Sequence, residues 1–132
     1  MRVFISYSTQ DEPFASAIRE RLSSDGFDVW NPEKKILPGE NWLTKTGRAL
    51  ERSDAVVFLL TKYSAVSPFV LNEIEYVLGQ RKFKDRVVPV FFGNPKPVPW
   101  ILRKLPHVEL PEDVKPARAA EAIVRQFPVA AV

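Results

Sequence analysis

The sequence contains no cysteine and a single histidine, His107. Without cysteine there is no thiol nucleophile, iron–sulfur cluster, zinc ribbon or disulfide framework, and the chain is compatible with a reducing compartment. One histidine is too few for a His-rich metal site or a His-centred triad. We therefore expect no metal site and no bound cofactor. His107 follows Pro106 in a strand-like segment, and we interpret it as a structural residue.

The chain also lacks a strong charge of either sign and any long apolar run. Nineteen basic residues stand against sixteen acidic ones, a formal net charge of +3, which is far from the basic excess of a dedicated nucleic-acid binder. The longest apolar stretch, residues 55–60, is much shorter than the roughly 20 residues that cross a bilayer. The first residues form a strand-like pattern without the apolar core of a targeting segment. We expect a cytoplasmic protein with no nucleic-acid partner and no membrane partner.

Length and proline content limit the architecture. With 132 residues, 45% of them hydrophobic, the chain can bury one substantial core but not two. Seven of the twelve prolines lie between residues 89 and 116, which predicts a rigid, loop-rich last third. We expect one domain over residues 1–132, either free-standing or a piece of a larger multidomain protein.

Strand patterns and helix patterns alternate along the chain. The strand patterns are short, apolar and β-rich, and the others repeat their apolar residues at helical spacing. Such alternation favours parallel strands joined by right-handed helical crossovers. We predict an α/β fold of the flavodoxin-like type, a three-layer sandwich with a five-stranded parallel sheet in the order 2-1-3-4-5 and helices on both faces. The predicted strands are 2–7, 27–30, 55–61, 86–92 and 107–110, and the predicted helices are 11–25, 42–53, 68–82 and 117–127.

Ligands of such sheets bind at the carboxyl ends of the strands, at the switch point between the first and third strands. Here that rule selects residues 7–11 and 61–67. A phosphoacceptor receiver site needs acidic residues where these two strands end, but segments 6–8 and 60–61 contain none. A flavodoxin or P-loop phosphate cradle needs glycine in the first turn, and residues 8–10 contain none. Neither class fits the switch point.

The helix predicted after Ser67-Pro68 carries two glutamates, and both lie at the border of its apolar stripe. Glu73 shares its flank with Phe69 and Tyr76, at i−4 and i+3, whereas Glu75 faces a flank with a glycine and a lysine. A carboxylate between two aromatic residues near a helix start is the better candidate for site chemistry. An ordinary boundary glutamate on a solvated helix face is the alternative.

Four pieces of the sequence, in order and at matching spacing, resemble the Toll/interleukin-1 receptor (TIR) domain family. They are Phe4-Ile5-Ser6-Tyr7-Ser8 with Asp11 (the first box), Pro38-Gly39 (the BB loop after the second strand), Ser53-Asp54-Ala55 before an apolar strand, and Ser64 with Ser67-Pro68-Phe69 ahead of Glu73 (the third region). The resemblance runs from about Val3 to Phe92 and more loosely to the end of the chain.

The resemblance implies one of two kinds of function. Some TIR domains are signalling scaffolds that assemble with other TIR domains, and others, including many bacterial and plant members, hydrolyse or cyclise NAD⁺ with one glutamate of the third helix. That glutamate corresponds to Glu73 here, so the resemblance favours a bacterial-type NAD⁺ glycohydrolase or cyclase that acts in immune or cell-death signalling. NAD⁺ is then the substrate, and nicotinamide plus ADP-ribose or a cyclic isomer are the products.

Other roles follow from the same resemblance. It implies that Tyr7 and Ser8 line the phosphates or the adenosine, that Ser67 belongs to the site, and that Trp42 roofs it. Phe69 stands where NAD-cleaving members often have tryptophan, stacked on the nicotinamide end. For these residues the alternatives are a strand-end turn, a helix cap and core packing.

The BB loop gives a second set of candidates. Lys34 and Lys35 attract a pyrophosphate or a neighbouring protomer in this hypothesis, or are simply solvated. With Pro38 and Gly39 they are the predicted assembly residues. The expected partners are other copies of the domain and a fused or separate sensor module. A non-catalytic TIR–TIR adaptor or virulence mimic remains the main alternative, and a module that binds a nucleotide without cleaving it is a third.

Overall fold

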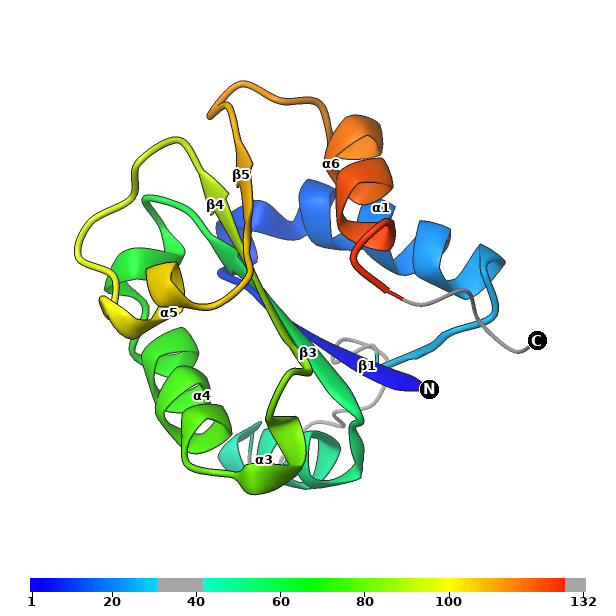
Figure 1. Ribbon diagram of the computed structural model, residues 1–132, viewed down its shortest axis with the longest axis vertical. Helices are drawn as coiled ribbons and strands as arrows, with labels where there is room; N and C mark the ends of the chain where they lie inside the picture. The colour runs from blue at the N-terminus through cyan, green and yellow to red at the C-terminus, as the bar shows by residue number, and fades with distance from the viewer. Residues whose placement is uncertain (31–41, 128–132) are drawn as a thin grey trace.

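The structure, a computed structural model, describes residues 1–30 and 42–127, and the side chains of the second segment from residue 46 onward. Within these residues the chain forms one parallel sheet with helices packed on both of its faces (Figure 1). The strands are β1 (Arg2–Ser6), β2 (Asp28–Val29), β3 (Ala55–Leu60), β4 (Val87–Phe92) and β5 (Val108–Leu110). The helices are α1 (Glu12–Ser24), α3 (Trp42–Arg52), α4 (Pro68–Leu78), α5 (Ile101–Lys104) and α6 (Pro116–Val124), with 3₁₀ turns at Thr9–Asp11, Ser64–Val66 and Arg81–Phe83.

The strand order is β2-β1-β3-β4-β5, and every neighbouring pair is parallel, which confirms the predicted fold class. In the central pair, Val3 lies opposite Ala55 and Ser6 lies opposite Phe58. The chain reverses its direction across the sheet after β2, so β1 and β3 are adjacent in the sheet although α1, β2 and α3 lie between them in the sequence. Their carboxyl ends form the switch point where this kind of sheet binds ligands.

Each face of the sheet buries its own apolar layer. Helices α1 and α6 pack on one face around Ile5, Ile18 and Ile123, and α3, α4 and α5 pack on the other around Phe58 and Ile74 (Figure 1). All six residues of β3 are buried, as expected for the central strand of a sheet covered on both sides. Because side chains alternate along a strand, neighbouring residues of β1 face different helical layers.

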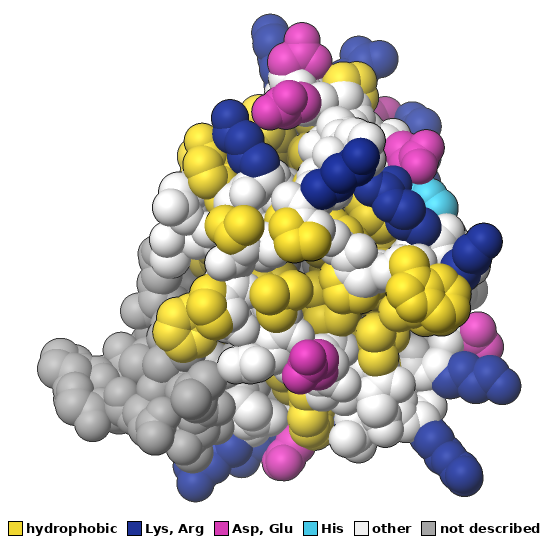
Figure 2. Space-filling model, turned by 90° about the vertical axis from the view of Figure 1, so that its left-hand side faces the viewer, with side chains coloured by type: hydrophobic (Ala, Val, Ile, Leu, Met, Phe, Trp, Pro, Cys, Tyr) yellow, Lys and Arg dark blue, Asp and Glu magenta, His cyan; other side chains and the backbone are white. Residues whose placement is uncertain are grey.

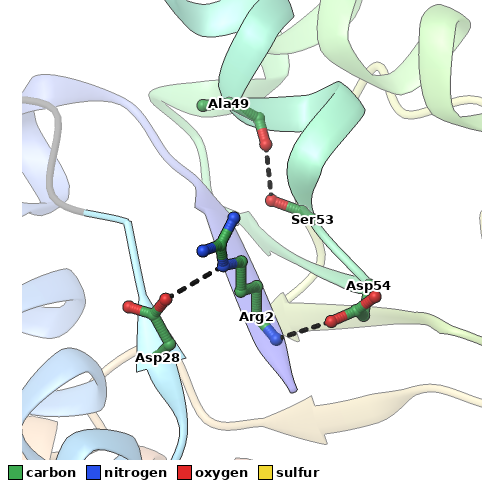
Figure 3. A network of polar contacts seen from close by, with 5 residues as sticks. All are labelled: Arg2, Asp28, Ala49, Ser53 and Asp54. Carbon is green, nitrogen blue, oxygen red and sulfur yellow. Dashed lines mark hydrogen bonds and ion pairs between the residues drawn. The ribbon is translucent and has the colours of Figure 1, made fainter.

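Polar contacts join the amino ends of the strands (Figure 3). The backbone N–H of Arg2 donates to Asp54 Oδ2 over 2.8 Å, and Arg2 Nε donates to Asp28 Oδ2 over 3.1 Å. Ser53 Oγ, at the end of α3, donates to the carbonyl of Ala49 over 2.7 Å. The two contacts of Arg2 thus tie the amino ends of β1, β2 and β3 to one another.

Several local features differ from the sequence-based expectation. The third helix ends at Leu78 instead of continuing to Lys82, because Gly79 is a poor helix former and a separate 3₁₀ turn follows. The proline-rich connection contains the one-turn helix α5, which apolar periodicity over so few residues could not indicate. Asp11 stands at the N-cap of α1 without a side-chain capping bond, because its carboxylate accepts a hydrogen bond from Thr61 instead.

Pro89 lies in the middle of β4, which is an interior strand. On one side Pro89 lies opposite Phe58 of β3. On the other side β5 is short, and its pairing with β4 begins only at Val90. At Pro89 the strand thus has a partner on one side alone, and the missing N–H of proline interrupts no ladder.

Candidate functional site

A small pocket lies between α3 and α4, on the face of the sheet opposite α1 and α6. Its volume is about 140 Å³, and its lining residues are Thr46, Gly47, Leu50, Phe69, Asn72, Glu73 and Tyr76. An engineered protein cavity of about 150 Å³ accepts benzene. The pocket therefore has room for one six-membered ring and not for a whole dinucleotide.

The local sequence of α4 places Glu73 in this pocket. Ser67 caps the helix by accepting the N–H of Val70, and Pro68 occupies the first helical position, where its missing N–H is not needed. With the start fixed, Val70, Ile74 and Val77 face the sheet and are buried. Phe69, Glu73 and Tyr76 share the flank that turns toward α3, as predicted from their spacing, whereas Glu75 is exposed.

Burial raises the pKa of Glu73 to about 8 from an ordinary 4.5. Ser6, the last residue of β1, acts in the opposite direction and lowers the pKa through its hydroxyl, although no hydrogen bond of standard geometry joins the two side chains. A carboxyl group with this pKa is mostly protonated at neutral pH in the empty pocket. A cation that enters the pocket favours the ionised form, so its binding is coupled to the release of a proton.

The loops at the carboxyl ends of β1 and β3 are joined by buried hydrogen bonds. Thr61 Oγ1 donates to Asp11 Oδ2 over 2.6 Å and accepts the backbone N–H groups of Tyr63 and Ser64. The N–H of Thr61 in turn donates to Ser64 Oγ over 2.7 Å. Burial raises the pKa of Asp11, and the bond from Thr61 partly offsets the rise. This network fixes the segment that leads into α4, and so it holds the helix that carries Glu73.

Tyr7 and Ser8 are close to this region in sequence but differ in placement. Tyr7 packs on the α1 and α6 side of the sheet, where its hydroxyl accepts a hydrogen bond from Arg19 over 3.3 Å. Burial and a hydrogen bond to Glu12 raise the pKa of Tyr7 to about 12. Ser8 is buried, and its hydroxyl donates to Gln10. Neither residue lines the pocket of Glu73, and their role in binding a substrate stays a prediction.

The remaining predicted residues fall into three groups. Phe69 lines the pocket with 52% of its surface exposed, and Ser67 serves as the cap of α4. Trp42 is the first residue of α3, but its side chain is outside the described part of the structure. The four loop residues also lie outside the described residues; they are Lys34, Lys35, Pro38 and Gly39.

Sequence analysis did not single out Ser6 or Thr46 as site residues. Both side chains are almost fully buried, and Ser6 Oγ and Thr46 Oγ1 have no hydrogen-bond partner within the described protein. Ser6 ends a buried strand, and Thr46 shares a helix flank with Ala49 and Leu50. A polar residue on the apolar side of a predicted element is the sequence feature that could have indicated both. Within residues 1–30 and 42–127, no group of three acidic or histidine side chains is arranged to hold a metal ion.

Apolar side chains are also exposed near α4 and α5, outside the lining of the pocket. Figure 2 shows the side of the molecule that carries α4 and α5, and yellow side chains are spread across it. Val66 is 67% exposed and Trp100 is 71% exposed. In the described part of the chain, no helix is long and apolar enough to span a membrane.

Comparison with known families identifies the chain. A family model described as "TIR domain" matches residues 3–125, which is nearly the whole sequence. The chain is a TIR domain. This agrees with the resemblance drawn from its sequence boxes, while the bacterial NAD-cleaving type is a finer assignment that the match does not make.

Individual relatives of this TIR domain come from plants and animals. The TMV resistance protein N of Nicotiana glutinosa is 26% identical over 93 residues, which make up 68% of this chain and 8% of that protein. The chain thus spans a small fraction of the length of this relative. Among solved structures, a TIR-STING receptor from C. gigas in complex with 2′,3′-cGAMP superimposes with a TM-score of 0.72 at 27% identity, and it covers 94% of this chain and 38% of its own.

Two further structures share the fold at lower identity. The TIR domain of the Toll-related receptor TRR-2 from Hydra magnipapillata has a TM-score of 0.68 and 17% identity, with 81% of this chain and 82% of that chain covered. A prokaryotic SEFIR domain has a TM-score of 0.63 and 13% identity, with 95% and 90% covered. At these identities the two structures show that the fold is shared and nothing more.

Proposed function

We propose that this TIR domain cleaves the bond between nicotinamide and ribose in NAD⁺, with Glu73 as its catalytic residue. The observation that supports this most directly is the place of Glu73, which lines a ring-sized pocket between α3 and α4 together with the aromatic residues Phe69 and Tyr76. Membership of the TIR family adds support, because many members are NAD⁺-cleaving enzymes.

The reaction suits a single carboxylate. The nicotinamide ring of NAD⁺ is positively charged, and it takes the electrons of the glycosidic bond when it leaves. It therefore departs as a neutral molecule and needs no general acid. The ribose carbon becomes cationic, as in glycoside hydrolysis, and an ionised Glu73 stabilises that charge more in the transition state than in the ground state. Water then adds to the ribose carbon and releases one proton to solvent, which gives ADP-ribose; attack by the adenine ring of the same molecule gives a cyclic isomer.

Burial of Glu73 fits this chemistry in a specific way. The positively charged nicotinamide ring of NAD⁺ favours the ionised carboxyl group, so substrate binding displaces the proton that the empty pocket retains. The carboxylate formed in this way is poorly hydrated, and its attraction to the developing sugar cation is correspondingly strong.

Nicotinamide release from NAD⁺ tests the proposal, with Glu73→Gln compared with Glu75→Gln. Both changes remove a carboxylate from α4, but Glu75 is exposed and lies outside the pocket. We expect the rate to fall about 10²–10³-fold in Glu73→Gln and to stay near wild type in Glu75→Gln. The assay is run with the protein both dilute and clustered on beads. Equal rates for the wild type and Glu73→Gln would remove Glu73 from the mechanism.

A second candidate function is a TIR–TIR adaptor without catalysis, and the exposed apolar residues near α4 and α5 favour it. In that case Glu73→Gln leaves partner binding unchanged, and substitution of Pro38 or Gly39 abolishes it. In either case we propose that the domain works in the cytoplasm in immune or cell-death signalling, that it associates with copies of itself, and that a sensor module, fused or separate, brings the copies together.

A further inference from the structure

Another pocket lies at the amino end of β4, between the last turn of α4, the 3₁₀ turn that follows it and α5 (Figure 1). Its volume is about 580 Å³, within the roughly 300–1,000 Å³ of pockets that enclose drug-sized ligands. Most of its wall is apolar, with Leu78, Val87, Val88, Ile101 and Leu105 among the lining residues. It shares no lining residue with the pocket of Glu73, and the proposed cleavage of NAD⁺ does not use it.

One backbone position of β4 faces this pocket without a strand partner. The N–H of Val56 in β3 donates to the carbonyl of Arg86 over 3.0 Å, so Arg86 faces β3. Backbone groups alternate between the two sides of a parallel strand, so the N–H and the carbonyl of Val87 face away from β3. On that side β5 begins to pair only at Val90, and the segment that leads into β5 lines the pocket. Within the described residues neither group of Val87 has a hydrogen bond, so Val87 offers a donor and an acceptor side by side.

These two backbone groups restrict what can fill the pocket. A ligand that is only hydrocarbon here, such as an acyl chain, would cover the N–H and the carbonyl of Val87 and leave both unpaired, which costs free energy. An extended peptide pairs with every second residue of a strand, but the next residue on this side is Pro89, which has no N–H. A flat ring that carries one acceptor beside one donor matches a single residue. The hydrogen-bonding edge of a nucleobase has this pattern.

Two cationic side chains line the same pocket. Arg81 and Lys84 are exposed, and neither forms an ion pair within the described residues. The N–H of Lys84 donates to the carbonyl of Arg81 over 3.1 Å, and residues three apart in such a 3₁₀ turn lie on the same side of it. The other polar lining residues are Asp85, whose carboxylate can accept hydrogen bonds from ribose hydroxyls, and the uncharged Gln80 and Gln126. Two cations against one carboxylate favour an anion such as a phosphate.

We propose that this pocket binds a nucleotide, with the edge of its nucleobase on the backbone of Val87 and its phosphate on Arg81 and Lys84. Lys84 and Val87 are three positions apart, hence at most about 10 Å along the chain, a separation that a mononucleotide spans. The apolar walls cover the faces of the base. Because the pocket is separate from that of Glu73, the proposal stands or falls independently of NAD⁺ cleavage.

NMR titration of the full chain with AMP, adenosine, ribose 5-phosphate and octanoate tests the site. We expect AMP to bind more tightly than the other three, and the amide resonance of Val87 to shift with AMP and adenosine but much less with ribose 5-phosphate. Ribose 5-phosphate that binds as tightly as AMP would mean a phosphate site without recognition of a base, and tighter binding of octanoate would mean a site for an acyl anion. Either result, or no shift among the lining residues with AMP, would overturn the proposal.

Charge variants test the phosphate contact. Arg81→Gln combined with Lys84→Gln should weaken AMP binding about tenfold or more and leave adenosine binding unchanged. Lys82→Gln is the matched control, because it removes a cation from the same turn that does not line the pocket and lies 4.9 Å from the centre of the Phe83 ring. It should bind AMP like the wild type. A double variant that retains the wild-type affinity for AMP would contradict the assignment of Arg81 and Lys84.

A backbone variant tests the contact with the base. Val87→Pro removes the N–H that faces the pocket, and Pro89 already occupies the same side of this strand without interrupting its pairing with β3. Val87→Ala keeps the N–H and controls for the shorter side chain. Relative to Val87→Ala, we expect Val87→Pro to weaken the binding of AMP and of adenosine about two- to tenfold. Equal affinities would rule out this contact, and if Val87→Pro does not fold, the amide shift of Val87 in the wild type decides the same point.

Discussion

At the scale of single residues, the protonation of Glu73 links binding, catalysis and stability. A pKa of about 8 means that the folded, ligand-free protein retains a proton that the unfolded chain releases near pH 4.5. The contribution of this group to stability is complete below pH 4.5 and is lost as the pH rises through 8. Under the proposed function, activity should have the opposite dependence on pH, because the ionised form of Glu73 is the one that would stabilise a sugar cation.

The first prediction concerns unfolding by urea between pH 4.5 and 9. The wild type should lose stability across this range, by as much as about 5 kcal/mol at about 1.4 kcal/mol per pH unit, because only its unfolded state ionises Glu73. Glu73→Gln cannot ionise there, so its stability should change less with pH and exceed that of the wild type above pH 8. Parallel pH dependences of the two proteins would contradict the burial of this carboxyl group.

The second prediction concerns the pH dependence of nicotinamide release. Since kcat/KM reports the free enzyme, it should rise about tenfold per pH unit and level off near pH 8, whereas kcat should level off at lower pH because bound NAD⁺ favours the carboxylate. Ser6→Ala removes a hydroxyl that lowers the pKa of Glu73, so it should move the kcat/KM inflection to higher pH. An inflection unmoved by this change would show that Ser6 does not act on Glu73.

At the scale of elements, α1 is held to the end of β1 by one arginine. Arg19 donates to Glu12 and to the Tyr7 hydroxyl, and its guanidinium lies 5.7 Å from the centre of the Tyr7 ring. Only 12% of the Arg19 side chain is exposed, compared with 47% for Arg21 two residues later. The two arginines therefore offer a direct contrast between a buried and a solvated ion pair on the same helix.

The third prediction uses this contrast. Arg19→Ala removes the charged partner of Glu12 and one hydrogen bond of the Tyr7 hydroxyl, and because Glu12 is partly solvated we expect a loss of about 2 kcal/mol, less than the roughly 3–5 kcal/mol of a fully buried pair. Arg21→Ala breaks an exposed i,i+4 pair with Asp25 and should cost less than about 0.5 kcal/mol. Urea unfolding of both variants gives the comparison. Similar losses would show that the Arg19 pair is effectively solvated.

At the scale of the whole molecule, the pocket is too small for the proposed substrate. Pockets that enclose a drug-sized ligand usually measure about 300–1,000 Å³, and this one measures about 140 Å³. It has room for one six-membered ring, so under the proposed function the rest of the dinucleotide needs contacts from elsewhere. A second copy of the domain is the source that we propose, in keeping with the tendency of TIR domains to self-associate.

The fourth prediction follows from the small volume of the pocket. The rate of nicotinamide release per molecule should rise with protein concentration, and light scattering on the same samples should show larger species as it rises. Clustering the protein on beads should raise the rate at low total concentration. A constant rate per molecule over a range in which the protein remains monomeric would show that one copy completes the site.

Much of the fold follows from local pattern, and part of the site does. The alternation of strand and helix patterns leads to the sheet order, and the spacing of Phe69, Glu73 and Tyr76 puts them on one flank because a helix has a fixed period. Ser6 and Thr46 join Glu73 only through packing of elements that are distant in sequence. No local pattern contains that information.

The ends of the described chain meet on one side of the sheet. The N–H of Asp28 donates to the carbonyl of Met1 over 3.1 Å, and Phe127, the last described residue, packs against Phe27 with 5.4 Å between ring centres. Both contacts lie at the amino ends of the strands, whereas Glu73 lies toward their carboxyl ends. A tether attached at Met1 would therefore start at the amino ends of the strands, away from the pocket of Glu73, so copies immobilised through this end can be crowded together with their pockets still open to small molecules.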